Sequence, residues 1–563
     1  MTQPDAEPTL PRWAGLPGAP ATPADDALPR GERVRRIEQR LLARLVTAVP
    51  GSRAWGWIGP LAVTAIAAVL RIVGLDRPAR LIFDETYYVK QAYSLLALGF
   101  EGRWDEDVDE AFAAGDTSGL LTDADYVVHP PLGKWLIAIG IRLLGQESVV
   151  GWRIAGAVLG ALSVLLVARI GRRLFASTLL GTTAGLLLAV DGMHLVLSRT
   201  GILDIFVSFF VLAAFGTLLL DREQSRRRLA ARAAPQLADG GLADPWGPRI
   251  GMRWWLLATG VLLGLACGVK WSGIYAVAVF GIAAVVWSTT ARRAIGVRLW
   301  FGGGFLRDGV PSFLTLVPVA VAAYVASWAS WFVSNDSYYR HWARDVNAVA
   351  DEPVRTWLPD TLNSWWQYHL TMWDFHTNLS SEHTYSSHPI GWLLQLRPTS
   401  FAWQDVAAPP GHTERWIEAV LAVGNPIVWW GGAIALVAVL WMAIVRRDWR
   451  AWAICVGYAA MYLPWFTYSA PFADRTIFTF YAVAFAPYVA LALTYGLGLL
   501  LGPRGAPRGL RTTGARFGVV VVALALLVAA FFWPIWTGQP VPYWYWKAHM
   551  WIGNLTEWRI GWI

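Results

Sequence analysis

Long apolar runs separated by polar segments dominate the chain from residue 57 onward. Most runs hold roughly 20 residues and few charged side chains, the length that a helix needs to cross the hydrocarbon core of a bilayer. Eleven runs follow this pattern: 57–75, 150–170, 176–197, 203–220, 254–269, 272–289, 311–332, 425–445, 451–468, 476–500 and 517–536. The sequence therefore predicts an all-α polytopic membrane protein with about eleven transmembrane helices.

The composition agrees with this pattern. Hydrophobic residues make up 55% of the chain and charged residues only 15%, which excludes an ordinary soluble protein of this length. Many of the 35 Trp lie where apolar runs meet polar loops, as in the aromatic belts at membrane interfaces. Cys267 and Cys455 both lie inside apolar runs, so they suggest neither a disulfide framework nor a cysteine metal site.

The distribution of Arg predicts the orientation of the spans. Arg clusters occur in five loops that alternate with loops poor in basic residues: 169–173, 222–232, 292–298, 446–450 and 504–516. Because cytoplasmic loops carry the excess of basic residues, these clusters place the N-terminus inside and, with eleven spans, the C-terminus outside. The net charge of +8 is thus assigned to the membrane surface, and no nucleic-acid partner is expected.

This topology divides the chain into five parts. Residues 1–50 are Pro- and Ala-rich and then Arg-rich, which indicates a disordered lead-in and a basic helix at the inner surface, or a binding tail; no removable signal peptide is recognised. Residues 54–333 form an N-terminal transmembrane catalytic module with an acidic outer loop, 76–149. An outer loop, 334–424, and a four-span module, 425–537, follow. The Trp-rich tail, 538–563, is expected to lie on the membrane.

An acidic pair, Asp84–Glu85, follows the apolar tripeptide Leu-Ile-Phe shortly after the first run. Adjacent side chains diverge on a helix or a strand, so the two acids are expected to do different work. One carboxylate is suited to take a proton from an acceptor hydroxyl, and the other to hold the local structure or the acceptor backbone. An equally open interpretation is an acidic helix start with Asp84 as the N-cap.

Basic residues near the outer ends of the runs are costly in a membrane unless they are used. Converging cations at one depth suit the phosphate of a lipid-linked donor, and Arg adds bidentate contacts. Lys134, which follows His129-Pro130-Pro131 at the end of the acidic loop, either binds that phosphate or reaches the lipid headgroups. The residues predicted to bind donor phosphate or lipid are Arg71, Lys134, Arg153, Arg199, Lys270 and Arg475. Alternatively, some of them do not share a ligand and each only anchors its helix at the membrane interface.

The second outer loop is rich in His, but its spacing matches no established ligand pattern, so we expect no metal site. Aromatic and hydroxyl side chains suit sugar faces and an acceptor backbone better. The residues predicted to contact sugar or acceptor are His129, His383, Tyr385, Ser386 and Trp392, although a His beside two prolines, such as His129, is more often structural.

Taken in order, these motifs resemble the protein O-mannosyltransferases, polytopic enzymes that move mannose from a polyprenyl phosphate to Ser or Thr hydroxyls. The resemblance covers almost the whole chain from Ala54 to the end of the eleventh run. It rests on Phe83-Asp84-Glu85, His129-Pro130-Pro131-Leu132-Gly133-Lys134, Arg153, Arg199 with Asp204, Gly268-Val269-Lys270-Trp271-Ser272-Gly273, His383-Thr384-Tyr385-Ser386-Ser387 with Pro389 and Trp392, and Leu463-Pro464-Trp465 with Arg475.

The resemblance implies a C-type glycosyltransferase fold with eleven spans and an inverting single displacement. It makes Asp84 the catalytic base and Glu85 a supporting acid near the acceptor, and it matches Arg71 and Arg153 to positions where a basic residue matters. The implied donor is polyprenyl-phosphate-mannose, the acceptor a Ser/Thr-containing polypeptide, and the secretion translocon a further partner. The implied location is the plasma membrane, with an extracytoplasmic active site. No β-trefoil domain fits in the second outer loop, and no cofactor or metal is expected.

Two other functions fit parts of the pattern. A related C-type glycosyltransferase would decorate a lipid or a cell-wall glycan and would not usually share both the His129–Lys134 and the His383–Trp392 motifs. A lipid-linked-sugar transporter or flippase is disfavoured, because neither inverted repeats nor broken spans are evident and the acids lie in an outer loop. A non-enzymatic lipid-binding scaffold would keep the cations but would not need Asp84.

Overall fold

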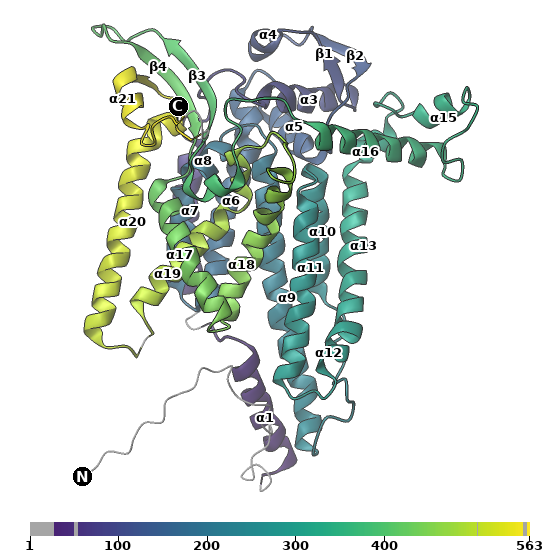
Figure 1. Cartoon of the computed structure of the whole chain (residues 1–563), viewed down its shortest axis with the longest axis vertical. Helices are drawn as coiled ribbons and strands as arrows, with labels where there is room; N and C mark the ends of the chain where they lie inside the picture. Colours follow the sequence, from purple (N-terminus) through teal and green to yellow (C-terminus); the bar gives the residue numbers. More distant parts are fainter. Residues whose placement is uncertain (1–27, 50–53, 504, 556–559, 563) are drawn as a thin grey trace.

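The computed structural model describes residues 28–49, 54–503, 505–555 and 560–562, so the predicted lead-in, 1–27, lies outside the described residues. Within them the chain forms an elongated helical bundle (Figure 1). The helices that run along the bundle are α2 (Trp55–Ile72), α6 (Val149–Phe175), α7 (Thr178–Ala189), α8 (Gly192–Ser198), α9 (Asp204–Ala238), α10 (Trp254–Val269), α11 (Gly273–Ala294), α13 (Val310–Ser327), α17 (Pro426–Ile444), α18 (Trp449–Met461), α19 (Ala486–Leu501) and α20 (Arg508–Trp536).

Shorter helices flank the bundle. They are α1 (Arg30–Leu45), α3 (Glu85–Leu98), α4 (Asp109–Ala113), α5 (Leu132–Leu144), α12 (Trp300–Gly302), the π-helix η2 (Gly303–Gly309), α14 (Ala329–Val333), α15 (Trp342–Asn347), α16 (Asp360–Asn378), the 3₁₀-helices η3 (Pro389–Leu394), η4 (Leu463–Tyr468) and η5 (Thr479–Ala484), and α21 (Tyr543–Ala548). The basic helix predicted before the first span is α1.

Each of the eleven apolar runs contains a helix, and the protein is a multi-pass membrane protein. Among the described residues, seven helices are long and apolar enough to cross a membrane, or eight if the bent pair α7–α8 is one span. The helices α10 and α19 are apolar but shorter. The count of eleven spans therefore stays a prediction.

The run 176–197 is broken, which the sequence did not indicate. Its two helices, α7 and α8, meet at an angle of 63°. The break occurs at Asp191, whose carboxylate accepts a hydrogen bond from the backbone N–H of His194 and so caps the start of α8. The same carboxylate accepts from the indole N–H of Trp429 at 2.7 Å. A buried acid that caps a new helix explains why this apolar run is not straight.

Two small sheets correct the all-α prediction. The strands β1 (Gly102–Trp104) and β2 (Leu120–Ala124) pair antiparallel within the acidic loop. The strands β3 (Thr399–Val406), β4 (Trp416–Ala422) and β5 (Pro540–Pro542) form a second antiparallel sheet in the order β3–β4–β5. Through β5 the C-terminal segment packs on the second outer loop, where Trp562 also donates to the carbonyl of Gln395. The described part of the tail is thus folded against protein, and its place at the membrane surface stays a prediction.

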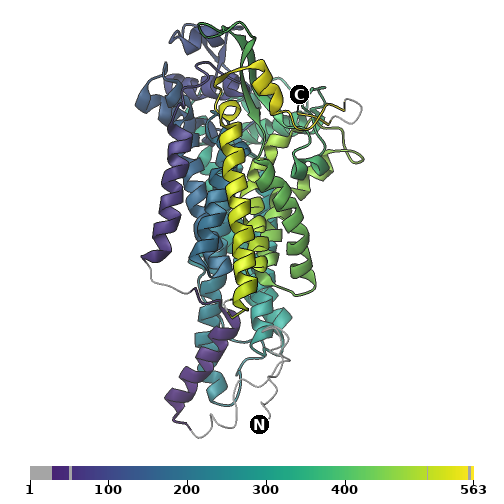
Figure 2. The same cartoon turned by 90° about the vertical axis from the view of Figure 1, so that its left-hand side faces the viewer.

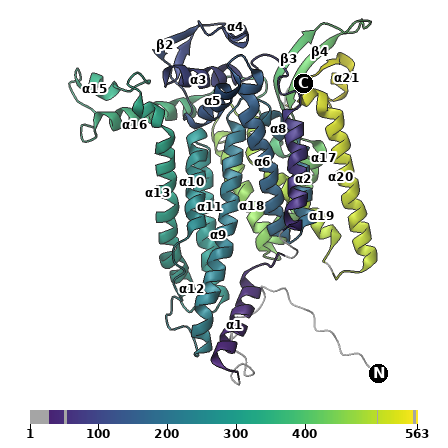
Figure 3. The same cartoon turned by 180° about the vertical axis from the view of Figure 1, so that it is seen from behind.

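The three segments predicted to lie outside gather at one end of the bundle (Figures 1 and 2). We call this the loop end; it carries α3, α5, α16 and the β3–β4–β5 sheet. The opposite end, with α1 and the last turns of α9, we call the α1 end. At the loop end α16 runs across the bundle axis and projects past α13, as Figure 3 shows from behind. Residues far apart in the sequence therefore meet at the loop end.

Candidate active site

Asp84 occupies the N-cap position of α3, but its side chain makes no capping hydrogen bond. The alternative of an acidic helix start with Asp84 at the N-cap is therefore confirmed for the position of this residue, whereas its carboxylate does not cap the helix. That carboxylate instead interacts with the hydroxyl of Tyr88, one helical turn further along α3. The helix start thus orients Asp84 without consuming its oxygens.

The turn before Asp84 is strained. Phe83 has a φ of +51°, in the left-handed region that costs a non-Gly residue about 1–2 kcal/mol. Its ring stacks on Phe401 of β3, with centroids 4.4 Å apart and an interplanar angle of 7°, and meets the edge of Phe480 at 5.3 Å. Phe401 of the second outer loop and Phe480 before α19 therefore hold Phe83, and with it the strained turn that leads into Asp84.

A buried ion pair lies close enough to Asp84 to change its pKa. Lys270, just after α10, and Asp204, the first residue of α9, form this pair with 2.7 Å between Nζ and Oδ2. Burial raises the pKa of Asp84 to about 6; the Lys270 ammonium opposes this shift and the Asp204 carboxylate adds to it. A carboxyl with such a pKa is ionised at neutral pH and is a stronger base than an exposed one.

Two histidines and an arginine complete the cluster. The rings of His129 and His376 stack with centroids 5.1 Å apart. His376 Nε2 lies 2.7 Å from the carbonyl oxygen of Val128, which only accepts, so Nε2 carries the proton and Nδ1 faces Arg475 Nη2 at 3.4 Å. Burial lowers the pKa of His376 to about 4 and that of His129 well below its usual value, so both rings are neutral at pH 7.

Arg475 keeps donor capacity. Its Nε is buried and has no hydrogen-bond partner within the described part of the chain, and its guanidinium carbon lies 5.6 Å from the ring of Tyr468. A buried donor without an acceptor is costly, and an incoming phosphate oxygen would satisfy it. We call the following residues the Asp84 cluster: Asp84, Tyr88, His129, Asp204, Lys270, His376, Arg475 and Tyr481.

The structure brings four predicted site residues into this cluster, namely Asp84, His129, Lys270 and Arg475. Sequence reasoning assigned no site role to the other four. Asp204 and His376 had been noticed, as part of a motif and of a His-rich loop, and Tyr88 lies one turn beyond Asp84. No signal pointed to Tyr481, whose ring centroid lies 5.4 Å from Lys270 Nζ.

Glu85 and Arg153 form a fully buried pair, so Glu85 holds the local structure, one of its two predicted roles, and Arg153 is not placed as a phosphate ligand. Arg153 Nε and Nη2 lie 2.7 and 2.8 Å from the two carboxylate oxygens of Glu85, and both side chains have no exposed surface. The remaining N–H groups of Arg153 donate to four backbone carbonyls: Leu75, Arg77, Pro78 and Arg80. Arg153 therefore has no donor left for a phosphate, and Glu85 stands behind the turn that carries Asp84.

Three further basic residues predicted to bind phosphate are used inside the protein. Arg71 is fully buried in the bundle, where its Nη2 lies 2.9 Å from His194 Nδ1. Arg199 donates to the carbonyls that end α2, among them Arg71 and Val73 at 3.0 and 2.8 Å. Lys134 is fully buried and pairs with Glu101 at 2.7 Å. In this arrangement all three hold helices and loops together through contacts within the protein.

The predicted sugar- and acceptor-binding residues of the second outer loop separate into two groups. His383 is exposed and meets the ring of Phe478 edge-on at 4.9 Å, Tyr385 lies beside it, and Ser386 pairs with Phe478 through a β-bridge. These three follow the segment that leads from Arg475 to α19. Trp392, in contrast, is fully buried, and its indole N–H donates to the hydroxyl of Ser387 at 2.9 Å. Trp392 is thus a core residue and not a surface for an acceptor.

Comparisons with known proteins agree on one group. Residues 128–232 match the family model "Dolichyl-phosphate-mannose-protein mannosyltransferase", and residues 361–555 match "C-terminal four TMM region of protein-O-mannosyltransferase". The chain is 38% identical over 522 residues to the polyprenol-phosphate-mannose–protein mannosyltransferase of Mycolicibacterium smegmatis (strain MKD8), covering 91% of this chain and 94% of the relative. The protein of the same name from Mycobacterium tuberculosis (strain ATCC 25618 / H37Rv) is 38% identical over 521 residues, covering 91% and 93%.

A solved structure shows the same fold. The Saccharomyces cerevisiae protein O-mannosyltransferase Pmt1-Pmt2 complex bound to the sugar donor superimposes with a TM-score of 0.65 at 15% sequence identity, covering 91% of this chain and 94% of that chain. The bundle described above is therefore the C-type fold of membrane glycosyltransferases.

Proposed function

Because the chain belongs to the polyprenol-phosphate-mannose–protein mannosyltransferase family, we propose that it transfers mannose from a polyprenyl phosphate to Ser or Thr hydroxyls of proteins. The observation that carries the catalytic part of this proposal is the Asp84 cluster. It places a carboxyl with a pKa of about 6 close to Lys270, with Arg475 in the same cluster. A base for a hydroxyl and cations for a departing phosphate are what this reaction requires.

The proposed step is a single displacement at C1 of mannose. The Asp84 carboxylate takes the proton of the acceptor hydroxyl while the hydroxyl oxygen forms a bond to C1. The bond between C1 and the phosphate oxygen breaks, and the polyprenyl phosphate leaves with the electron pair. Because attack and departure occur on opposite faces, the configuration at C1 inverts. Asp84 must therefore be ionised, and its carboxylate must be able to accept from the acceptor hydroxyl in addition to Tyr88, which fits its position without a capping bond.

The leaving phosphate gains one negative charge as its bond to mannose breaks. We assign the stabilisation of this charge to Arg475, whose Nε lacks an acceptor in the described chain, and to Lys270. Lys270 Nζ has three N–H donors, and among the described residues its hydrogen bond to Asp204 uses one of them, so the ammonium keeps donors for a phosphate oxygen. No resident cofactor or metal is part of this proposal.

The topology that goes with this reaction is eleven spans with the N-terminus in the cytoplasm. The loop end then faces the extracytoplasmic side of the plasma membrane, and the Arg-rich α1 end faces the cytoplasm. The collection of Arg clusters at the α1 end supports this orientation, since cytoplasmic loops carry the basic excess. A polypeptide emerging from the secretion translocon would reach the loop end first, along His383, Tyr385 and Ser386.

Replacing Asp84 with Asn tests the proposal. Membranes containing the variant are given radiolabelled polyprenyl-phosphate-mannose and a Thr-rich peptide, and the label in peptide, lipid and glycan fractions is counted. Loss of the base is expected to lower transfer to the peptide by about 10²–10⁴-fold. Asp123→Asn removes an exposed acid of the same loop, paired with Arg103, and should transfer at the wild-type rate.

Two results would contradict parts of this proposal. Transfer by Asp84→Asn above roughly a tenth of the wild-type rate would rule out Asp84 as the base. Wild-type label that accumulates in the lipid or glycan fraction and not in the peptide would assign the chain another acceptor.

A further inference from the structure

A second group of basic residues lies at the α1 end, far from the Asp84 cluster. Arg222 follows Asp204 by 18 residues on α9, which corresponds to about 27 Å along the helix axis. The hydrocarbon core of a bilayer is about 30 Å thick. If Asp204 lies at one membrane interface, Arg222 lies at the depth of the opposite headgroups. Any ligand of Arg222 is therefore distinct from the mannose donor.

Arg222 is buried and forms no ion pair within the described part of the chain. It is 7% exposed, and its guanidinium carbon lies 3.6 Å from the ring centroid of Trp449 on α18 and 5.6 Å from that of Trp287 on α11. Within the described part of the chain it makes no hydrogen bond, and its Nε is buried without a partner. Stacking on indole rings stabilises the cation but leaves the N–H groups at the edge of the guanidinium plane unsatisfied. These edges require an acceptor.

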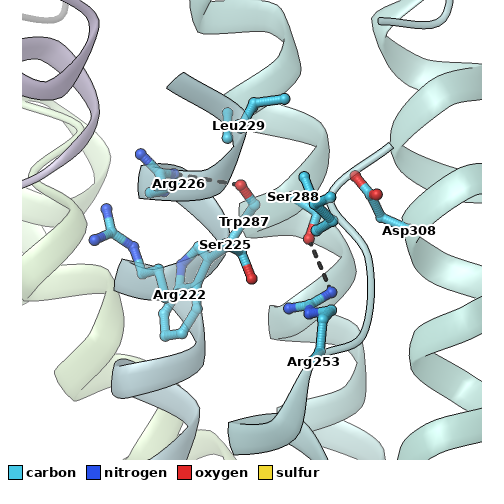
Figure 4. Close-up of a pocket in the computed structure, with 10 residues that line it drawn as sticks. Arg222, Ser225, Arg226, Leu229, Arg253, Trp287, Ser288 and Asp308 are labelled. Atoms are coloured by element: carbon cyan, nitrogen blue, oxygen red, sulfur yellow. Dashed lines mark hydrogen bonds between the residues drawn. The ribbon is translucent and has the colours of Figure 1, made fainter. Parts of the chain in front are cut away.

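Arg226 and Ser225 continue the same surface one turn along α9, and the three residues line one pocket (Figure 4). The guanidinium groups of Arg222 and Arg226 project to the same side of the helix, away from Arg253 and Asp308. The bonds of Arg226 are to neutral groups, chiefly the carbonyls of Leu45 and Trp287 at 3.2 and 3.3 Å, so its charge is not balanced by them. Two cations and a hydroxyl thus share this surface.

The acidic residues near Arg222 and Arg226 form ion pairs with other basic residues. Asp221 forms a bidentate pair with Arg253, and Asp308 a bidentate pair with Arg292 at 2.7 and 2.8 Å. Glu223 pairs with Arg173 and Arg227. Among the described residues, no carboxylate therefore forms an ion pair with Arg222 or Arg226, and a buried charge without such a partner is costly.

We propose that Arg222, Ser225 and Arg226 bind the phosphate ester of an anionic lipid headgroup at the α1 end. A phosphate offers several strong acceptor oxygens, and guanidinium edges bind them in pairs. Basic pockets between transmembrane helices at headgroup depth are the places where anionic lipids are recognised. The bound headgroup would join α9 to α11 and α18 through the two tryptophans that hold Arg222. This site is separate from the proposed mannose-transfer chemistry.

The experiment measures the unfolding midpoint of the purified full-length protein in detergent at 0.15 M salt, while one of three probes is titrated. The probes are dihexanoyl phosphatidylglycerol, dihexanoyl phosphatidylcholine and inorganic phosphate. Ser225→Asp introduces a carboxylate beside both arginines without removing the stacked guanidinium, and Arg222→Gln removes the cation. Arg227→Gln makes the same charge change as Arg222→Gln at a largely exposed position of the same helix and is the control.

Phosphatidylglycerol should raise the midpoint of the wild type and of Arg227→Gln at concentrations where phosphatidylcholine has no effect. Ser225→Asp and Arg222→Gln should bind phosphatidylglycerol at least about tenfold more weakly. Ser225→Asp with wild-type binding would overturn the proposal, even if Arg222→Gln proved too unstable to purify. An equal effect of inorganic phosphate would overturn the assignment to a lipid, and an equal effect of phosphatidylcholine would overturn recognition of the charge.

Discussion

Replacing Glu85 with Gln tests whether Glu85 has a structural role that differs from the catalytic role proposed for the adjacent Asp84. Glu85 and Arg153 are both fully buried and joined by two hydrogen bonds of 2.7 and 2.8 Å, and Glu85 also accepts from the N–H groups of Ile82 and Gly201 at 3.0 and 2.7 Å. Glu85→Gln leaves the Arg153 guanidinium buried without its counter-ion. Breaking one side of a buried ion pair costs about 3–5 kcal/mol. This is a large share of a typical net stability of about 5–15 kcal/mol.

Asp84→Asn is the matched comparison, because it makes the same chemical change one residue earlier. Burial raises the pKa of Asp84 to about 6, so its ionised form is already disfavoured in the folded protein. Removing that charge should leave the unfolding midpoint unchanged or raise it, while transfer falls. Glu85→Gln should instead lower the midpoint. In the protein that remains folded, the KM for the acceptor peptide should change less than about twofold, because the Glu85 carboxylate is fully buried and is occupied by Arg153 and two backbone N–H groups.

The assay is SDS-induced unfolding in mixed micelles, followed by mannose transfer at a temperature well below the midpoint. Arg153→Met and the double variant Glu85→Gln/Arg153→Met complete a thermodynamic cycle. The double variant should lose less stability than the sum of the two single variants, because neither partner is left as a lone buried charge. A normal midpoint for Glu85→Gln, or additive effects in the cycle, would refute the structural role of this pair.

Three further predictions concern the Asp84 cluster. Because the pKa of Asp84 is raised to about 6, kcat should be level above pH 7 and fall about tenfold per unit below pH 6 as the base takes up a proton; a profile that stays level down to pH 5 would contradict this. Arg475→Gln should lower kcat by about 10²–10³-fold if its guanidinium stabilises the leaving phosphate, and Arg475→Lys should recover part of the loss; unchanged kcat would remove Arg475 from the mechanism. Transfer should survive excess EDTA, because Lys270 and Arg475 supply the positive charge that stabilises the leaving phosphate. A loss of transfer that Mg²⁺ restores would show that the reaction needs a divalent cation.

The positions of the membrane helices followed from the sequence, because a helix in lipid must be apolar over nearly its whole length. The break at Asp191 did not, since one acid in an apolar run does not reveal whether its oxygens cap a helix or face a partner. The strands β3 and β4 were also missed. They lie in a loop rich in Trp, His and Tyr, where β3 pairs with β4, and β4 also pairs with β5 because the C-terminal segment returns to the loop end.

For the site, the sequence by itself singled out Asp84, Lys270 and Arg475, because charges next to apolar runs are conspicuous and expensive. It also singled out Arg71, Arg153 and Arg199, which the structure uses to satisfy backbone carbonyls and buried partners. A sequence shows that a charge is present but not which groups surround it. Only the tertiary structure decides that, because burial and hydrogen-bond partners come from segments such as α3, α6 and the turn after α8, which are distant in the chain.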